Sequence, residues 1–80
     1  MKKEVIMPKV GLDMEEGMIT SWLKKEGDSV VAGEPLMEIE TDKAVTEIEA
    51  SVTGTLVEIV VPEGETVEIA TVVAWVETND

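Results

Sequence analysis

The chain has 80 residues, 18 of them acidic and six basic, with no cysteine, no histidine and a net charge of −12. We therefore expect residues 1–80 to form one small domain without a disulfide framework, a thiolate or histidine metal site, or most self-contained catalytic mechanisms. The charge would repel nucleic acid and anionic membranes, so the expected partners are proteins with basic surfaces. No apolar run is long enough for a signal peptide or a membrane span, so we expect a soluble, intracellular domain.

Apolar residues recur at the short spacings of β-strands, which are rich in Val, Ile and Thr and bounded by Gly, Pro and acidic residues. The predicted strands are Lys3 to Met7, Met18 to Lys24, Ser29 to Val31, Leu36 to Glu40, Ala44 to Glu49, Thr55 to Val61, Thr66 to Glu68 and Val72 to Glu77. They predict an all-β fold: a flattened barrel or sandwich of two small four-stranded antiparallel sheets, a barrel-sandwich hybrid.

The second half of the chain repeats the first. One shift aligns Gly17 with Gly54, Glu26-Gly27 with Glu63-Gly64, Val30 with Val67, and Glu40-Thr41 with Glu77-Thr78. This repeat predicts a two-fold pseudo-symmetry, and each Glu-Gly pair predicts a turn whose glycine takes a positive φ. The junction after Glu40 and the chain termini should then lie at opposite ends of the molecule.

The segment from Pro8 to Glu16 interrupts the repeat, because the equivalent link, Ala50 to Thr53, is much shorter. The first strand runs from the terminal end, so this inserted loop should return close to Lys43. Insertions at a surface end commonly carry recognition. Met14, an apolar residue among acidic ones, either tucks under the loop or is offered to a partner. The predicted recognition residues of the loop are Gly11, Leu12, Asp13, Met14 and Glu15.

Lys43 stands at the central junction, in the polar break Glu40-Thr41-Asp42-Lys43, whereas the copy at the end of the chain, Glu77-Thr78-Asn79-Asp80, has no lysine. Asp before the lysine suits a tight β-turn that projects it into water. Most such lysines are only solvated charges. An exposed lysine is protonated and a poor nucleophile unless another enzyme presents it with an activated carboxyl group, so this position favours a modification site over a catalytic amine.

Two other groups of residues are interpreted as structural. Glu38, Glu40 and Asp42 could suggest calcium, but their alternating positions along a strand are typical of a solvated face. Trp22 and Trp75 do not align in the repeat, and we expect them to pack in or near the core.

The string Glu40-Thr41-Asp42-Lys43-Ala44, the upstream string Met7 to Gly17 and the run Trp22 to Asp28 resemble a known family. It is the lipoyl domain of the dihydrolipoamide acyltransferase (E2) of 2-oxo acid dehydrogenase complexes, of the pyruvate, acetoin or branched-chain type. The resemblance covers essentially the whole chain. It implies a single lipoyl carrier domain, with lipoic acid in amide linkage on Lys43 (N6-lipoyllysine) and with Asp42 and Ala44 helping partners to recognise the site.

The resemblance also implies partners. They are a thiamine-diphosphate-dependent 2-oxo acid decarboxylase (E1), the E2 catalytic core with coenzyme A, an FAD-dependent dihydrolipoamide dehydrogenase (E3), and a lipoate ligase or octanoyltransferase. The domain itself would be a monomeric, non-catalytic swinging-arm carrier, cytoplasmic or, in a eukaryote, in the mitochondrial matrix.

Three alternatives compete with this interpretation. A biotin carboxyl carrier domain characteristically has methionine on both sides of its lysine, whereas Asp42 and Ala44 flank Lys43 here. The lipoylated carrier of glycine cleavage is a longer chain. An unmodified acidic β-domain that mediates protein contacts would give Lys43 no more importance than Lys24 or Lys25.

Overall fold

The computed structural model describes residues 1–11, 14–41 and 44–79. The strands in these ranges are β1 (Lys2–Ile6), β2 (Glu16–Trp22), β3 (Ser29–Val30), β4 (Pro35–Glu40), β5 (Val45–Glu49), β6 (Gly54–Ile59), β7 (Thr66–Glu68) and β8 (Val72–Glu77). All eight strands predicted from the sequence are present, with ends that differ by at most two residues.

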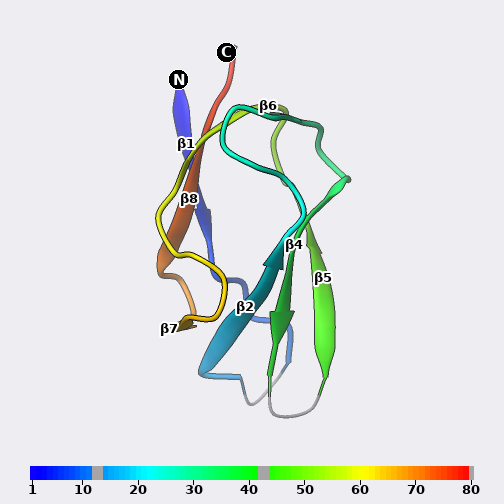
Figure 1. Ribbon diagram of the computed structural model, residues 1–80, viewed down its shortest axis with the longest axis vertical. Helices are drawn as coiled ribbons and strands as arrows, with labels where there is room; N and C mark the ends of the chain where they lie inside the picture. The colour runs from blue at the N-terminus through cyan, green and yellow to red at the C-terminus, as the bar shows by residue number, and fades with distance from the viewer. Residues whose placement is uncertain (12–13, 42–43, 80) are drawn as a thin grey trace.

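The strands form two four-stranded sheets, in the orders β1-β8-β6-β3 and β5-β4-β2-β7, and every neighbouring pair is antiparallel. The sheets pack as the two layers of a flattened sandwich that measures 36 × 21 × 19 Å (Figure 1). The predicted all-β sandwich is therefore confirmed.

The two-fold repeat extends to the register of the strands. β2 pairs with β4 as β6 pairs with β8, and the two pairs have a bulge at the equivalent place, between Ile19 and Ser21 and between Leu56 and Glu58. β4 pairs with β5 as β8 pairs with β1. Each sheet thus combines strands from both halves, so neither half could form its sheets alone.

Two buried clusters fill the space between the sheets. One contains Met7, Met14, Ile19, Met37, Ile39, Val61 and Val73, and the other contains Val30, Leu36, Ala50, Leu56, Ala74 and Val76. Met7 and Met37 occupy the positions that Ala50 and Ala74 occupy in the other half. The indole of Trp22 packs against both clusters and donates its N–H to the carbonyl of Val61 at 2.9 Å, which confirms its packing role.

The two Glu-Gly turns hold the halves together through hydrogen bonds of their glutamates. Gly27 and Gly64 have φ angles of 96° and 90°, as predicted. The carboxylate of Glu63 accepts a hydrogen bond from the backbone N–H of Trp22 at 2.8 Å, and that of Glu26 accepts one from the N–H of Ile59 at 2.8 Å. Each turn therefore binds the long strand of the other half beside its bulge.

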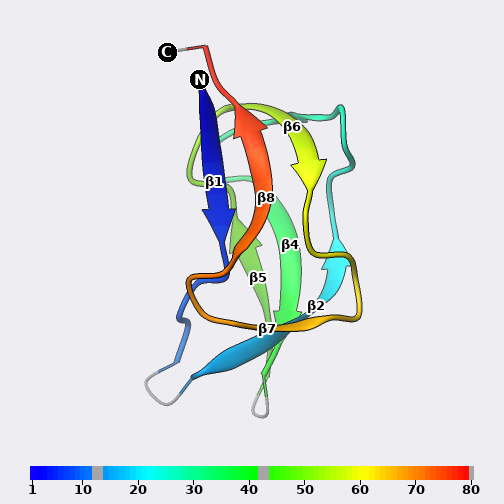
Figure 2. The ribbon, with the colours of Figure 1, turned by 90° about the vertical axis from the view of Figure 1, so that its left-hand side faces the viewer.

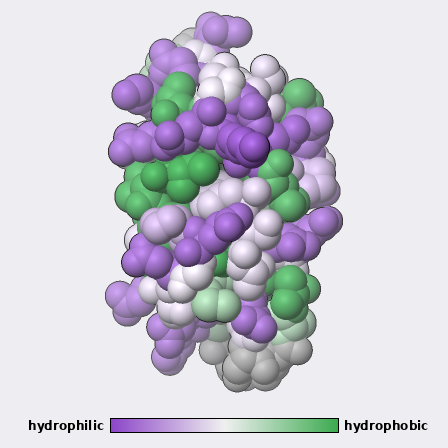
Figure 3. All heavy atoms as spheres, in the orientation of Figure 1, coloured by the Kyte–Doolittle hydropathy of each residue, from purple (hydrophilic) through white to green (hydrophobic). Residues whose placement is uncertain are grey.

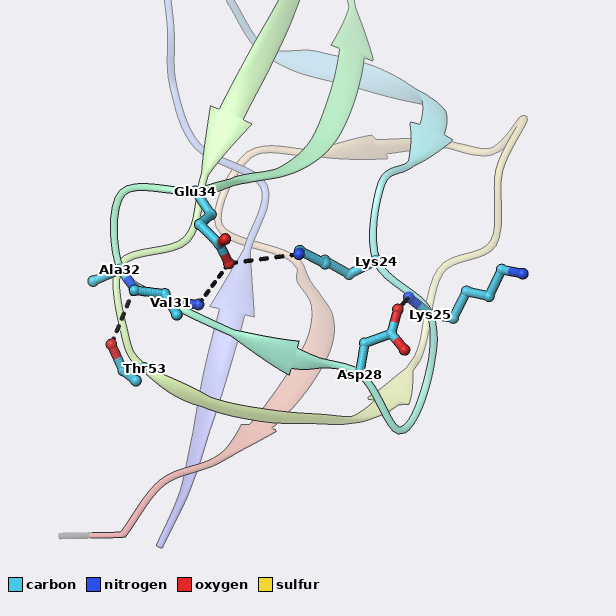
Figure 4. A network of polar contacts seen from close by, with 7 residues as sticks. All are labelled: Lys24, Lys25, Asp28, Val31, Ala32, Glu34 and Thr53. Atoms are coloured by element: carbon cyan, nitrogen blue, oxygen red, sulfur yellow. Dashed lines mark hydrogen bonds and ion pairs between the residues drawn. The ribbon is translucent and has the colours of Figure 1, made fainter.

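The connection from β2 to β4 is held by its own polar side chains (Figure 4). The carboxylate of Asp28 accepts the backbone N–H of Lys25 at 2.9 Å. Glu34 Oε1 accepts the N–H of Val31 at 3.1 Å and lies 3.5 Å from Lys24 Nζ. Lys24 thus has a structural partner, whereas the side chain of Lys25 points away from the other residues drawn.

Candidate functional site

The junction between β4 and β5 is closed by two residues that flank Asp42 and Lys43. The backbone N–H of Thr41 donates to the carbonyl of Ala44 at 2.9 Å, and Glu40 pairs with Val45 in the adjoining ladder. The Thr41 hydroxyl lies 3.3 Å from the same carbonyl and 3.4 Å from the Ala44 nitrogen. Asp42 and Lys43 lie outside the described residues, so the predicted turn and modification remain predictions.

This junction lies at the end of the molecule opposite the termini. β4 ends and β5 begins far from the N- and C-terminal residues, which lie side by side (Figures 1 and 2). β1 runs toward the junction, and the described parts of the inserted loop return to it, because Met18 of β2 pairs with Glu40. Both placements predicted from the repeat are confirmed for the described residues; Leu12 and Asp13 lie outside them.

The inserted loop is anchored by Met14, which is only 9% exposed. Its sulfur accepts the backbone N–H of Val10 at 3.3 Å, and its own N–H donates to the carbonyl of Gly11 at 3.2 Å. Its terminal methyl lies 2.9 Å from where a Cβ on Gly17 would stand. Of the two alternatives for Met14, the tucked one holds. Gly11 and Glu15 are exposed, so a recognition role for them remains a prediction.

The surface beside the junction is open to solvent. Ala44 is exposed, and Val45 is 57% exposed. A hollow next to Thr41 is lined by Glu16, Gly17, Met18, Glu40, Thr41 and Thr66. Much of the face shown in Figure 3 is hydrophilic, with separate hydrophobic groups. A group joined to the chain at this point could therefore extend into water without displacing the core.

The described residues around the junction are rich in carboxylates. Glu38 of β4 lies directly opposite Glu47 of β5. Within residues 1–11, 14–41 and 44–79, no group of acidic side chains is arranged to hold a metal ion.

In the same described residues no helix is long and apolar enough to cross a membrane.

The sequence pattern does not single out one feature of the site. Thr41 stands in a polar string, and only the recurrence of Glu-Thr in both halves signals a shared structural task for its hydroxyl. The burial of Met14 is one of the two predicted alternatives, whereas its position over Gly17 is visible only in the structure.

The comparisons with known proteins agree with this geometry. The structure superimposes on the lipoyl domain of the 2-oxoglutarate dehydrogenase complex from Azotobacter vinelandii with a TM-score of 0.77, at 31% identity, covering 96% of this chain and 98% of that one. The model of the Biotin_lipoyl family, described as biotin-requiring enzyme, matches residues 3–76. The chain belongs to this family, as a lipoyl domain.

Relatives of this lipoyl domain are components of larger enzymes. It is 49% identical over 71 residues to the dihydrolipoyllysine-residue acetyltransferase component of the pyruvate dehydrogenase complex of Corynebacterium glutamicum, covering 89% of this chain and 10% of the relative. It is 42% identical over 76 residues to the acetyltransferase component of the acetoin cleaving system of Bacillus subtilis, covering 95% and 19%.

A third relative is the dihydrolipoyllysine-residue succinyltransferase component of the 2-oxoglutarate dehydrogenase complex of Bartonella vinsonii, 40% identical over 79 residues and covering 99% of this chain and 19% of the relative. The lipoyl domain thus spans between 10% and 19% of the length of these three relatives. A 2-oxoglutarate type was not among the complexes expected from the sequence.

Proposed function

We propose that this lipoyl domain carries lipoate on Lys43 and serves as the swinging-arm carrier of a 2-oxo acid dehydrogenase complex. The observation that supports the proposal is the place of the Asp42-Lys43 segment. It joins β4 to β5 at an open end of the lipoyl-domain fold, and the backbone nitrogen of Thr41 and the backbone oxygen of Ala44, the residues that flank it, are 2.9 Å apart. The exposure of Ala44 and Val45 fits an attached arm.

Attachment is an amide bond formation. The Lys43 amine nitrogen bonds to the carboxyl carbon of an activated lipoate, the activating group leaves, and the amine gives up a proton. Bound lipoate supplies the disulfide chemistry that a chain without cysteine lacks, accepting an acyl group and electrons. The domain itself contributes no catalytic group in this proposal: it presents the lysine.

The proposed partners are those that a carrier needs. An E1 decarboxylase loads the arm, an E2 core with coenzyme A unloads it, an E3 flavoprotein reoxidises it, and a lipoate ligase or octanoyltransferase attaches it. The names of the relatives support a pyruvate, acetoin or 2-oxoglutarate complex. We place the domain in the cytoplasm, or in the mitochondrial matrix of a eukaryote, as a monomer whose tethering raises the local concentration of the arm.

The intact mass of the protein tests this proposal. The wild type, Lys43→Arg and Lys25→Arg are produced in cells supplied with both lipoate and biotin. We expect a lipoyl-sized increment on the wild type and on the Lys25→Arg control, and none on Lys43→Arg. A biotin-sized increment, or no increment in the presence of a competent lipoate ligase, would overturn the proposal.

The recognition role of the inserted loop needs a separate experiment. Replacing Leu12-Asp13 by Gly-Ser leaves the anchor Met14 in place, so the loop should keep its attachment to the sandwich. We expect normal lipoylation but slower reductive acylation by the cognate E1, because the predicted contact side chains are gone. Unchanged acylation kinetics would refute this role.

A further inference from the structure

The closure at the β4–β5 junction has a copy at the opposite end of the molecule. There the backbone N–H of Thr78 donates to the carbonyl of Met1 at 2.7 Å, and its hydroxyl donates to the same oxygen at 3.0 Å. The repeat places Thr78 on Thr41, and the strand register places Met1 on Ala44. The same side chain thus makes the same kind of contact at both ends of the sandwich.

The two copies differ in how the chain connects them. Thr41 and Ala44 are three residues apart, whereas Thr78 and Met1 are 77 residues apart. A short covalent link therefore cannot be what brings the threonine to its partner at the terminal end. The contact is made by the threonine and by the antiparallel ladder beside it, where Lys2 pairs with Glu77. By analogy, Thr41 closes the end of β4 and β5 by its own bonding.

We propose that Thr41 is a positioning residue for the modification of Lys43, an inference that rests on the proposed function. Its backbone and hydroxyl contacts with Ala44 fix the two points from which the Asp42-Lys43 segment starts and ends. A lipoate-attaching enzyme then meets the lysine with fewer backbone conformations to restrict on binding. Positioning of a reacting group before the reaction is a recognised source of rate in group transfer.

Two substitutions separate the effect of the Thr41 hydroxyl from the effect of its side-chain shape. Valine keeps the β-branched shape and deletes the hydroxyl, whereas serine keeps the hydroxyl and deletes the methyl group. If bonding to Ala44 positions the segment, Thr41→Ser preserves the effect and Thr41→Val removes it. Thr78→Val is the matched control, because it deletes the equivalent hydroxyl at the opposite end of the molecule and at a more buried position, 7% exposed.

The test is the rate at which a purified lipoate ligase, with lipoate and ATP, modifies the wild type, Thr41→Val, Thr41→Ser and Thr78→Val. Loss of one hydrogen bond predicts a kcat/KM about fivefold lower for Thr41→Val. Thr41→Ser and Thr78→Val should stay within about twofold of the wild type, a change smaller than the loss of one such bond. Thermal unfolding of all four proteins shows whether Thr78→Val costs at least as much stability as Thr41→Val.

A normal rate for Thr41→Val, or an equal loss in Thr78→Val, would overturn the inference, because the hydroxyl would then serve stability alone. Amide hydrogen exchange gives a second measurement that does not depend on the ligase: the Ala44 N–H should exchange faster in Thr41→Val, and an unchanged rate would also overturn it. Failure of the proposed function is distinguishable, since the wild type itself would then remain unmodified.

Discussion

Ala70 takes a backbone conformation that alanine rarely adopts, with a φ of 70°. The repeat places it on Gly33, whose φ is 94°. The surroundings are also equivalent: the N–H of Ala70 donates to the carbonyl of Met7 at 2.8 Å, and that of Gly33 donates to the carbonyl of Ala50 at 2.9 Å. One loop therefore carries glycine, and its copy carries an alanine in the same left-handed turn.

The reciprocal substitutions, Ala70→Gly and Gly33→Ala, should change stability in opposite directions. The left-handed region destabilises a residue with a Cβ by about 1–2 kcal/mol. Glycine avoids this strain, but it lowers the free energy of unfolding by about 0.4–1 kcal/mol because it raises the conformational entropy of the unfolded chain. Ala70 is exposed, so its methyl group contributes little burial, and a Cβ on Gly33 would meet no atom within 4 Å. The net effect is about 0.5–1 kcal/mol, stabilising for Ala70→Gly and destabilising for Gly33→Ala.

Differential scanning calorimetry measures both changes. In a domain of this size they correspond to shifts in Tm of about 2–8 °C, upward for Ala70→Gly and downward for Gly33→Ala. The double variant, which exchanges the two residues, should melt close to the wild type. A lower Tm for Ala70→Gly would refute the assignment of strain to this position, and a higher Tm for Gly33→Ala would refute the equivalence of the two loops.

Urea denaturation tests three further predictions, two on the close packing around glycines and one on a hydrogen bond between the halves. Gly54→Ala should cost about 2–3 kcal/mol, because the new Cβ would overlap the backbone carbonyl of Glu77. Gly17→Ala should cost only about 1 kcal/mol, because the ends of methionine side chains can move aside, and an equal loss would contradict this reasoning. Glu63→Gln should cost about 0.5–1 kcal/mol by weakening the bond to the N–H of Trp22. Glu63 with Trp22 and Glu26 with Ile59 each form a glutamate clasp, a hydrogen bond from a backbone N–H of one half to a glutamate of the other. If the denaturation midpoint of Glu63→Gln stays at the wild-type value, its clasp adds nothing to stability.

The strands were predictable because they depend on the local spacing of apolar residues. Their symmetry was predictable because the second half of the sequence repeats the first. Alternating apolar residues fix which face of a strand is buried, and a repeat preserves register through a bulge, so the pairing of Ile19 with Ile39 predicts that of Leu56 with Val76. The opposite placement of the termini and the junction follows from the two-fold alone. None of this requires knowledge of a particular long-range contact.

The hydrogen bonds of the glutamate clasps and the contact of Met14 with Gly17 could not be predicted, because the sequence pattern does not show which segments meet. Glu26 and Glu63 in acidic turns look like solvated charges, and only the structure shows that their carboxylates reach the backbone of the opposite half. Met14 was equally compatible with burial and exposure until its contacts with Val10 and the glycine beneath it were known.

The internal repeat separates what the fold requires from what the lysine end adds. Features present in both halves, such as the glutamate clasp and the threonine closure, must serve the scaffold, because the terminal end has no lysine. Thr41 belongs to this shared set, and its proposed role comes only from the segment that it brackets. The inserted loop, anchored by Met14 over Gly17, is much longer than the equivalent link in the second half, Ala50 to Thr53. Recognition that is specific to one complex should therefore reside in this loop, and exchanging it between lipoyl domains should transfer partner preference while leaving the scaffold intact.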